Sequence, residues 1–321
     1  MKRREFINKM GALGAALTLA NRAQSAEPER KTYPKGGGDY GTELPLKERL
    51  WLALPIQASA DFLHHSKYKK YINSQSVSEI EEMESRYEVL RISNEALSKI
   101  IREASRTTPK FGEVHFWHLY GMGYVIKTPT ACFGIDIHHR HAEKLAPLLD
   151  FALSTHKHLD HYSAQHIAAM AELSKPYVSN FAENRWISPK GGDFTFGEIS
   201  VKARPCDHPP AEKNYVLNFE IDCGPKTNHC TILHIGDTHR PEQLNPSNPI
   251  DVLIAHVQGE MDLPTVTRNI SPKWTLVSHL YELSWDQYRW SMASGIKRCM
   301  ECTNTLAIPP IWGERLVWRG R

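Results

Sequence analysis

Two spacings of apolar residues divide the chain at about residue 110. Before that point, apolar side chains recur at roughly three- or four-residue intervals, as at Val77, Ile80 and Met83, which predicts amphipathic helices. Beyond it, short apolar runs end in polar residues, which is typical of buried strands followed by loops. We therefore expect a helical segment over residues 43–110 and a strand-containing domain over residues 111–321.

The helical segment has two features that mark its helices. Residues 46–54 supply an apolar face, and Ser76-Val77-Ser78-Glu79 resembles a capping box, which starts a helix. These helices could be an appendage packed on the domain, or a lid that shapes substrate access. The sequence leaves both interpretations open. A further helix is expected from Asp286 onward, with Cys299 and Cys302 one turn apart.

The first 26 residues have the pattern of an export signal. A basic start is followed by a short apolar stretch over residues 10–20 and by small residues up to Ala26, which predicts a signal peptide. Arg3-Arg4, with Phe6 and Ile7, resembles a twin-arginine signal. We expect the twin-arginine export machinery as a partner and a periplasmic or otherwise exported location. The apolar stretch of about 11 residues is short of the roughly 20 that an uncleaved membrane anchor needs.

Residues 27–42 predict a linker, because they are rich in Gly, Pro and charge. The 321-residue chain is 41% hydrophobic, which is enough for a sizeable core. Its formal net charge is only +3, and Lys and Arg are scattered, so no basic stripe indicates a nucleic-acid partner.

The segment His156-Lys157-His158-Leu159-Asp160-His161 is the strongest chemical signal in the chain. It follows the apolar run 151–154, so its side chains would lie on the loop that leaves a buried strand. On a loop, His156 and His158 can turn toward one ion, and Asp160 and His161 toward another. Imidazole suits zinc, and a carboxylate adds the charge that helps to hold a hydroxide.

The H-x-H-x-D-H pattern resembles the signature of the metallo-β-lactamase superfamily, whose fold places two β-sheets between helices. Three further residues occur in that family's order, each at or shortly after the end of a strand-like run: His208, Asp237 and His279. The resemblance implies an α/β fold, an αββα sandwich, with an N-terminal helical extension. It is closest to proteins like ascorbate-6-phosphate lactonase and extends to enzymes like N-acylphosphatidylethanolamine phospholipase D.

The resemblance to this branch covers about residues 113–321. Its members begin with a strand, a Gly-containing turn, a second strand and an Asp, which are matched here by residues 114–126 and 133–136. Two departures concern the substrate rather than the metals. His256 stands where many relatives have a small or apolar residue, and Asp136 is followed by Ile-His-His instead of Pro.

The resemblance also implies the metal ligands and the reaction. His156, His158 and His208 would hold one divalent ion, Asp160, His161 and His279 would hold a second, and Asp237 would bridge them. A hydroxide shared by the ions would attack an ester, lactone or phosphodiester. The ligand set favours Zn²⁺, with Mn²⁺ and Fe²⁺ also compatible. Asp160 would orient the hydroxide and take its proton.

Some roles and functions stay open at the level of sequence. His256 could protonate a leaving group, or it could be a polar residue that caps its strand.

The expected substrate is a small, anionic molecule. One alternative is a phospholipase D-like enzyme for lipid head groups. It would need an apolar groove or an exposed amphipathic helix, which Trp51 and Leu52 could supply, although a buried helix explains them equally well. Another is a non-catalytic metal-binding protein with the same fold.

Six cysteines complete the candidate chemistry. In an oxidising compartment some could pair. Cys223 and Cys230 flank a turn-like span and could bridge a hairpin, whereas Cys299 and Cys302 lack further ligands for a zinc site.

Overall fold

Two β-sheets hold the apolar runs of the second part of the chain. The computed structural model describes residues 44–209, 212–258, 261–286 and 290–320, and all of them belong to one compact unit. The first sheet has the strand order β13-β1-β2-β3-β4-β5. Its strands are β1 (Glu113–His118), β2 (Tyr124–Lys127), β3 (Cys132–Ile135), β4 (Phe151–Leu153), β5 (Tyr177–Val178) and β13 (Arg315–Arg319).

The second sheet has the order β12-β11-β10-β9-β8-β7-β6. Strands β9 to β12 run parallel, and β6 to β9 pair antiparallel. The strands are β6 (Gly192–Phe196), β7 (Ile199–His208), β8 (Glu212–Asp222), β9 (Thr231–His234), β10 (Val252–His256), β11 (Trp274–Ser278) and β12 (Leu306–Ile308). Strands β4, β7, β9, β10 and β11 end at or just before the polar motifs, as the sequence predicts.

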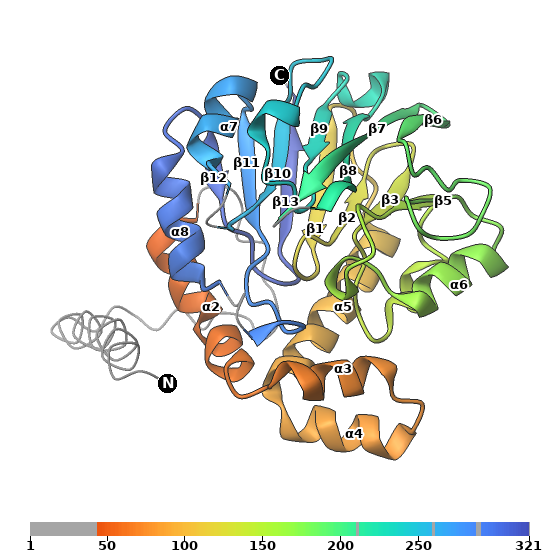
Figure 1. Ribbon diagram of the computed structural model, residues 1–321, viewed down its shortest axis with the longest axis vertical. Helices are drawn as coiled ribbons and strands as arrows, with labels where there is room; N and C mark the ends of the chain where they lie inside the picture. The colour runs from red at the N-terminus through yellow and green to blue at the C-terminus, as the bar shows by residue number, and fades with distance from the viewer. Residues whose placement is uncertain (1–43, 210–211, 259–260, 287–289, 321) are drawn as a thin grey trace, which may run out of the picture. The chain divides into compact units, whose positions relative to one another are not determined.

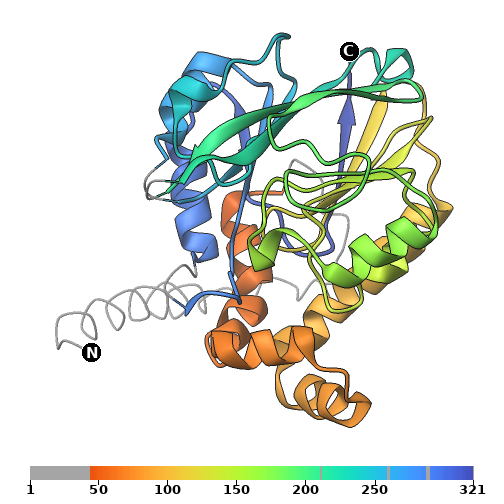
Figure 2. The ribbon, with the colours of Figure 1, turned by 45° about the vertical axis from the view of Figure 1, so that its right-hand side comes forward.

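The two sheets lie as adjacent layers (Figures 1 and 2). One continuous cluster of buried side chains joins them, with Phe116 and Phe133 from the first sheet and Phe219, Ile232 and Ile254 from the second. Because both inner faces are apolar, burying them against each other fixes the spacing of the layers. The loops at one edge of the two sheets are thereby brought together.

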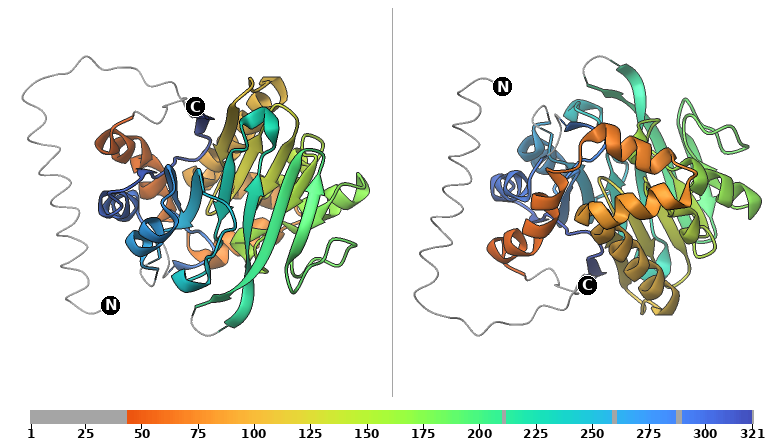
Figure 3. Two further views of the ribbon diagram at one scale, coloured as in Figure 1. Left: turned by 90° about the horizontal axis from the view of Figure 1, so that it is seen from above. Right: turned by 90° about the horizontal axis from the view of Figure 1, so that it is seen from below.

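Helices cover the outer faces of the sheets. They are α2 (Leu46–Ala60), α3 (His65–Asn73), α4 (Val77–Arg86), α5 (Glu88–Arg106), α6 (Ala164–Glu172), α7 (Leu263–Ile270) and α8 (Met292–Glu301). The right-hand view of Figure 3 shows α2 to α5 from below. Four helices thus occupy the segment for which the sequence predicts helices.

Two helix starts refine the sequence-based expectations. Ser76 caps α4 by accepting a hydrogen bond from Glu79 N, so the predicted helix start is confirmed. The box is one-sided, because the Glu79 carboxylate binds Ser74 and Lys70 instead of the backbone at Ser76. The last helix, α8, begins at Met292, after the Ser291 cap, rather than at Asp286.

Buried polar contacts join the N-terminal helices to the sheets. The Arg49 guanidinium of α2 donates to both carboxylate oxygens of Glu314, at 2.8 and 2.6 Å, and both side chains are buried. Lys99 of α5 donates to Gly313 O at 2.7 Å. Breaking a buried pair of this kind leaves an uncompensated charge, so the contact makes detachment of α2 costly. The helices that hold these contacts are therefore part of the packed structure.

Several expectations concern residues that the structure does not describe. The predicted signal peptide (residues 1–26) and linker (residues 27–42) lie outside the described residues. Within the described part of the chain, no helix is both long enough and apolar enough to cross a bilayer. All six cysteines are buried and free, so Cys223 and Cys230 carry no disulfide here, although Cys223 N donates to Cys230 O at 2.9 Å.

Candidate metal centre

The loop after β4 is held by a buried aspartate that follows β3. Asp136, which has a left-handed φ of 47°, accepts hydrogen bonds from Thr155 N at 2.7 Å and from the Thr155 hydroxyl at 2.8 Å. The same carboxylate binds His161 Nδ1 at 2.8 Å. One aspartate therefore fixes the start of the loop and the imidazole at its end, where a 3₁₀ turn spans Leu159–His161.

The other candidate ligands come from three strand ends of the second sheet. His208 ends β7, beside a bulge, and Asp237 follows β9. The turn before Asp237 requires glycine, since Gly236 has a φ of 53° and a Cβ there would lie 2.6 Å from Val216 Cγ1. His279 follows β11 with a φ of 65°, held by a hydrogen bond from its N–H to Gly121 O at 2.9 Å.

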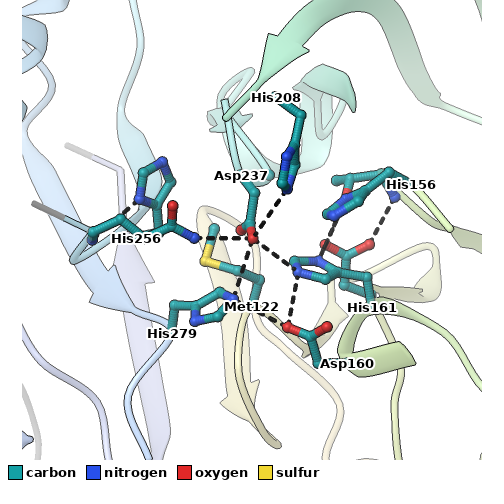
Figure 4. A network of polar contacts seen from close by, with 12 residues as sticks. Met122, His156, Asp160, His161, His208, Asp237, His256 and His279 are labelled. Atoms are coloured by element: carbon teal, nitrogen blue, oxygen red, sulfur yellow. Dashed lines mark hydrogen bonds and ion pairs between the residues drawn. The ribbon is translucent and has the colours of Figure 1, made fainter. Parts of the chain in front are cut away.

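The structure brings all seven predicted ligands together in two groups. In the first group, nitrogen atoms of His156, His158 and His208 lie within 4.8 Å of one another. In the second, the ligand atoms of four residues meet the same limit: Asp160, His161, Asp237 and His279. Figure 4 shows the Asp237 carboxylate between the imidazoles of both groups.

Asp237 is the common partner of the two groups. Its Oδ2 lies 3.4 Å from His161 Nε2, 3.3 Å from His279 Nε2 and 3.9 Å from His208 Nε2. The Gln258 side chain also donates to Oδ2, at 3.0 Å. A carboxylate in this position could ligate one metal ion in each group. This is the bridging role that the resemblance implies.

The hydrogen bonds of the imidazoles leave ligand atoms available. Because the Thr155 hydroxyl proton points to Asp136, its oxygen accepts from His156 Nδ1, at 3.0 Å. His161 donates from Nδ1 to Asp136, and His208 donates from Nδ1 to Pro209 O. In each ring the neutral tautomer then carries its lone pair on Nε2, as metal binding requires.

Buried atoms without hydrogen bonds test whether the site suits metal ions. Among the described residues, the following atoms are buried and lack a hydrogen-bond partner: Nε2 of His156, His161, His208 and His279, and Oδ1 of Asp160 and Asp237. Leaving so many polar atoms buried and unsatisfied is costly, unless a cation takes their lone pairs. The donor set, imidazole with carboxylate, fits divalent metal ions such as Zn²⁺.

The two groups differ in charge. Burial, together with the neighbouring imidazole of His161, lowers the pKa of His156 well below its usual value, and burial and His208 lower the pKa of His158. In the second group burial raises the pKa of Asp160. The neighbouring His161 and His279 outweigh this effect and hold the pKa of Asp160 well below its usual range. The first group thus consists of imidazoles alone, whereas the second contains carboxylates.

His256 makes contacts that favour the structural interpretation. It is fully buried, its Nε2 donates to Thr238 O at 2.6 Å, and its Nδ1 accepts from Gln258 N at 3.2 Å. Burial lowers its pKa to about 4. A neutral imidazole with both nitrogens engaged has no proton to give to a leaving group. Its contacts instead hold the loops that carry Asp237 and Gln258.

Sequence reasoning missed two parts of the surroundings. Asp136 was seen only as a motif residue, and its hydrogen bond to His161 depends on a contact between separate loops. No pattern in the sequence indicates the second, a buried group formed by Tyr120 and Glu282. The Tyr120 hydroxyl donates to Glu282 Oε1 at 2.6 Å, and burial, with the charge of Asp160, raises the pKa of Glu282 to about 8.

Four other histidines, outside the two groups of ligands, are mostly buried. His234 lies in β9 and binds Met122 O at 2.9 Å, and His138 binds Tyr162 O at 2.8 Å. His139 is also buried, and His141 is partly exposed. None of the four belongs to either group of clustered metal-ligating atoms among the described residues.

Comparisons with known proteins agree with this geometry. Residues 125–279 match the family model described as a beta-lactamase superfamily domain, a span that contains all seven residues. A UPF0173 protein of Pyrococcus abyssi is 27% identical over 191 residues, which cover 54% of this chain and 85% of that protein. Residues 125–279 are therefore similar to a beta-lactamase superfamily domain.

A solved structure shares the fold. Igni18, a novel metallo hydrolase from the archaeon Ignicoccus hospitalis, matches with a TM-score of 0.52 and 14% identity, over 65% of this chain and 100% of that chain. The α/β fold is the metallo-β-lactamase type with two sheets and flanking helices. The predicted fold class is confirmed, whereas the narrower branch stays a prediction.

Proposed function

We propose that this protein is a metal-dependent hydrolase that binds two divalent ions, most suitably Zn²⁺. The first would be held by His156, His158 and His208, and the second by Asp160, His161 and His279, with Asp237 between them. The observation that carries the proposal is the convergence of these buried side chains with their lone pairs unsatisfied. The similarity in fold to a protein described as a novel metallo hydrolase is consistent with it.

The chain's own residues would orient the reaction. Bound divalent ions would supply a water of lowered pKa and would stabilise developing negative charge. Asp160 has one oxygen 3.2 Å from His161 Nε2 and 3.1 Å from His279 Nε2, and its Oδ1 has no hydrogen-bond partner among the described residues. This free oxygen is suited to accept a proton from the attacking water. Asp136 holds the His161 ring, and Gln258 holds the Asp237 carboxylate.

The substrate we propose is a small ester, lactone or phosphodiester that carries negative charge. Arg240 is half-exposed and lies three residues beyond Asp237, so it could meet an anionic group. The lipid alternative has a specific observation in its favour. Trp51, Leu54 and Phe62 are exposed at 45, 38 and 82%. Vesicle binding by the full chain that is lost in Trp51→Ser/Phe62→Ser would favour lipid head groups as substrates.

The deciding experiment measures metal content and hydrolysis together. Protein purified without added metal should contain about two zinc ions per chain, and should hydrolyse bis(p-nitrophenyl) phosphate or a simple lactone. His158→Ala should lose activity and bound metal, whereas His229→Ala, which changes an exposed imidazole paired with Asp222, should lose neither. Absence of turnover in a chain that retains both ions would replace the hydrolase by a metal-binding protein.

We also propose that the protein is exported, on the basis of residues 1–26 alone. Replacing Arg3-Arg4 by Lys-Lys should retain the protein in the cytoplasm of an expressing bacterium, if the twin-arginine machinery carries it. Fractionation of cells followed by blotting is the measurement. An unchanged distribution would remove this proposal without affecting the hydrolase.

A further inference from the structure

A third group of metal-ligating side chains lies apart from the metal centre, where α3 meets the segment that follows His279. His64 and His65, at the start of α3, both approach Asp286. His64 Nε2 lies 2.8 Å from Asp286 Oδ2, and His65 Nδ1 lies 2.6 Å from the same oxygen. The two rings are 4.3 Å apart between centroids. Two imidazoles and a carboxylate oxygen thus meet at one point, with all three ligand atoms within 4.8 Å.

The backbone orients this carboxylate. His65 N donates to Asp286 Oδ1 at 2.9 Å, which turns Oδ2 toward the two rings. The side chains are 60% (His64), 36% (His65) and 35% (Asp286) exposed, so the group is open to solvent and to ions in it. This arrangement differs from the exposed pair of His229 and Asp222, where a single imidazole meets the carboxylate.

We propose that His64, His65 and Asp286 bind a zinc ion that fastens α3 to the segment after β11. Two imidazole nitrogens and one carboxylate oxygen are a suitable set for Zn²⁺, with water in the fourth position. Ligand atoms about 2.0–2.1 Å from a tetrahedral ion lie roughly 3.3 Å apart. The two contacts between imidazole and carboxylate, at 2.8 and 2.6 Å, would therefore lengthen by only about 0.6 Å. Side-chain rotation at partly exposed positions can supply that movement.

The proton balance is straightforward. In the metal-free group His65 Nδ1 donates its proton to Asp286 Oδ2, and His64 Nε2 lies 2.8 Å from the same oxygen. With Nε2 of His64 on the metal, its proton moves to Nδ1, which now caps α3 by accepting from Ser66 N at 3.2 Å. The protonated Nδ1 would give up that bond and donate instead to the Ser66 hydroxyl, 2.9 Å away. His65 would carry its proton on Nε2, toward solvent. Each imidazole stays neutral, and the carboxylate supplies the only ligand charge.

Other contacts show what the ion would stabilise. Lys69 Nζ lies 4.0 Å from the centroid of the Trp285 ring, next to Asp286. The Tyr68 hydroxyl lies 2.8 Å from His138 Nε2, and His138 in turn binds the backbone beside His161. Helix α3 therefore contacts both the segment after His279 and the surroundings of His161. An ion at its start would hold this helix in place beside the metal centre.

The test counts ions in three full-length proteins. Wild type, His64→Ala/His65→Ala and the matched control His229→Ala are loaded with zinc, passed through a desalting column at micromolar free zinc, and analysed for zinc per chain. We expect wild type and the control to retain one more equivalent than the double variant. Asp286→Asn should weaken this third ion by about 100-fold or more, because changes outside the ligand shell already cost roughly 10–100-fold.

A second measurement separates this site from the metal centre. In a His156→Ala/His158→Ala background, added zinc should still slow amide exchange in α3, and Asp286→Asn should abolish that effect. The outcome does not depend on hydrolysis, so failure of the proposed function would leave it unchanged. Equal zinc content in wild type and His64→Ala/His65→Ala, with no change in exchange, would show a hydrogen-bonded group only and overturn the proposal.

Discussion

The two halves of the metal centre satisfy their buried groups in different ways. Asp160 and Asp237 lie within 3.4 Å of His161 and His279, so this group can form ion pairs even without a metal. His156 and His158 have no carboxylate of their own, and burial and neighbouring imidazoles lower their pKa values. One half therefore resembles a charged network, and the other is a set of imidazoles without a carboxylate. Protons and metal ions should compete mainly in the charged half.

The first and largest effect is expected at Asp237, which belongs to both halves. Asp237→Ala removes the shared carboxylate and leaves His161 and His279 with Asp160 alone. We expect loss of both ions and a loss of turnover beyond about 100-fold. Removing a residue that only contacts a metal ligand already costs roughly 10–100-fold in metal affinity or activity. His208→Ala should instead lose one ion, because His208 belongs only to the group of three imidazoles. Metal analysis of the two variants decides the matter, and equal losses would contradict a bridging role.

A smaller effect is expected at Asp136, which contacts the charged half from outside. Asp136→Asn keeps the shape but removes the charge that faces His161 Nδ1 at 2.8 Å. Loss of such a partner typically costs about 10–100-fold in metal affinity or activity. Zinc titration against a chelator measures it, with Asp222→Asn, at an exposed His–Asp pair, as the matched control. Unchanged affinity in Asp136→Asn would mean that the loop alone orients His161.

The difference between these two aspartates also explains what the sequence could predict. Asp237 and the six other candidate ligands stand at strand ends in a fixed order, so a linear pattern identifies them and the fold that gathers them. The hydrogen bond from His161 to Asp136 joins loops 25 residues apart, and no periodicity reports such a contact. The same holds for Tyr120 and Glu282, whose side chains meet across 162 residues.

For His256 the sequence predicts the position of the residue but not its role. Its place at the end of β10 is what the pattern predicts, but its role depends on where its two nitrogens point. The structure engages both with backbone groups. Likewise, the helices over 43–110 follow from periodicity, whereas the buried contact between Arg49 and Glu314 that joins them to the sheets does not.

The prediction with the smallest effect at neutral pH concerns His166. It tests how burial alone changes the pKa of an imidazole, as proposed for His156 and His158. His166, in α6, is fully buried, has no hydrogen bond from its ring nitrogens among the described residues, and burial lowers its pKa to about 3. An unfolded chain binds a proton there near pH 6.5, and the folded chain does not. The contribution of neutral His166 to the free energy of unfolding is therefore complete above pH 6.5, and it is lost as pH falls toward 3.

His166→Leu should remove this dependence without touching the metal ligands. Relative to wild type, the metal-free variant should gain about 3 kcal/mol in free energy of unfolding at pH 4 compared with pH 7, because only the unfolded wild-type chain takes up this proton over the roughly 2.5 pH units between its pKa of 6.5 and pH 4. Urea unfolding at both pH values in the presence of a chelator measures the difference, and groups common to both proteins cancel. If the two proteins instead kept a constant stability difference from pH 7 to 4, His166 would have to be protonated in the fold. Burial alone would then not account for neutral imidazoles at His156 and His158, and the contrast between the two halves would rest on their carboxylates.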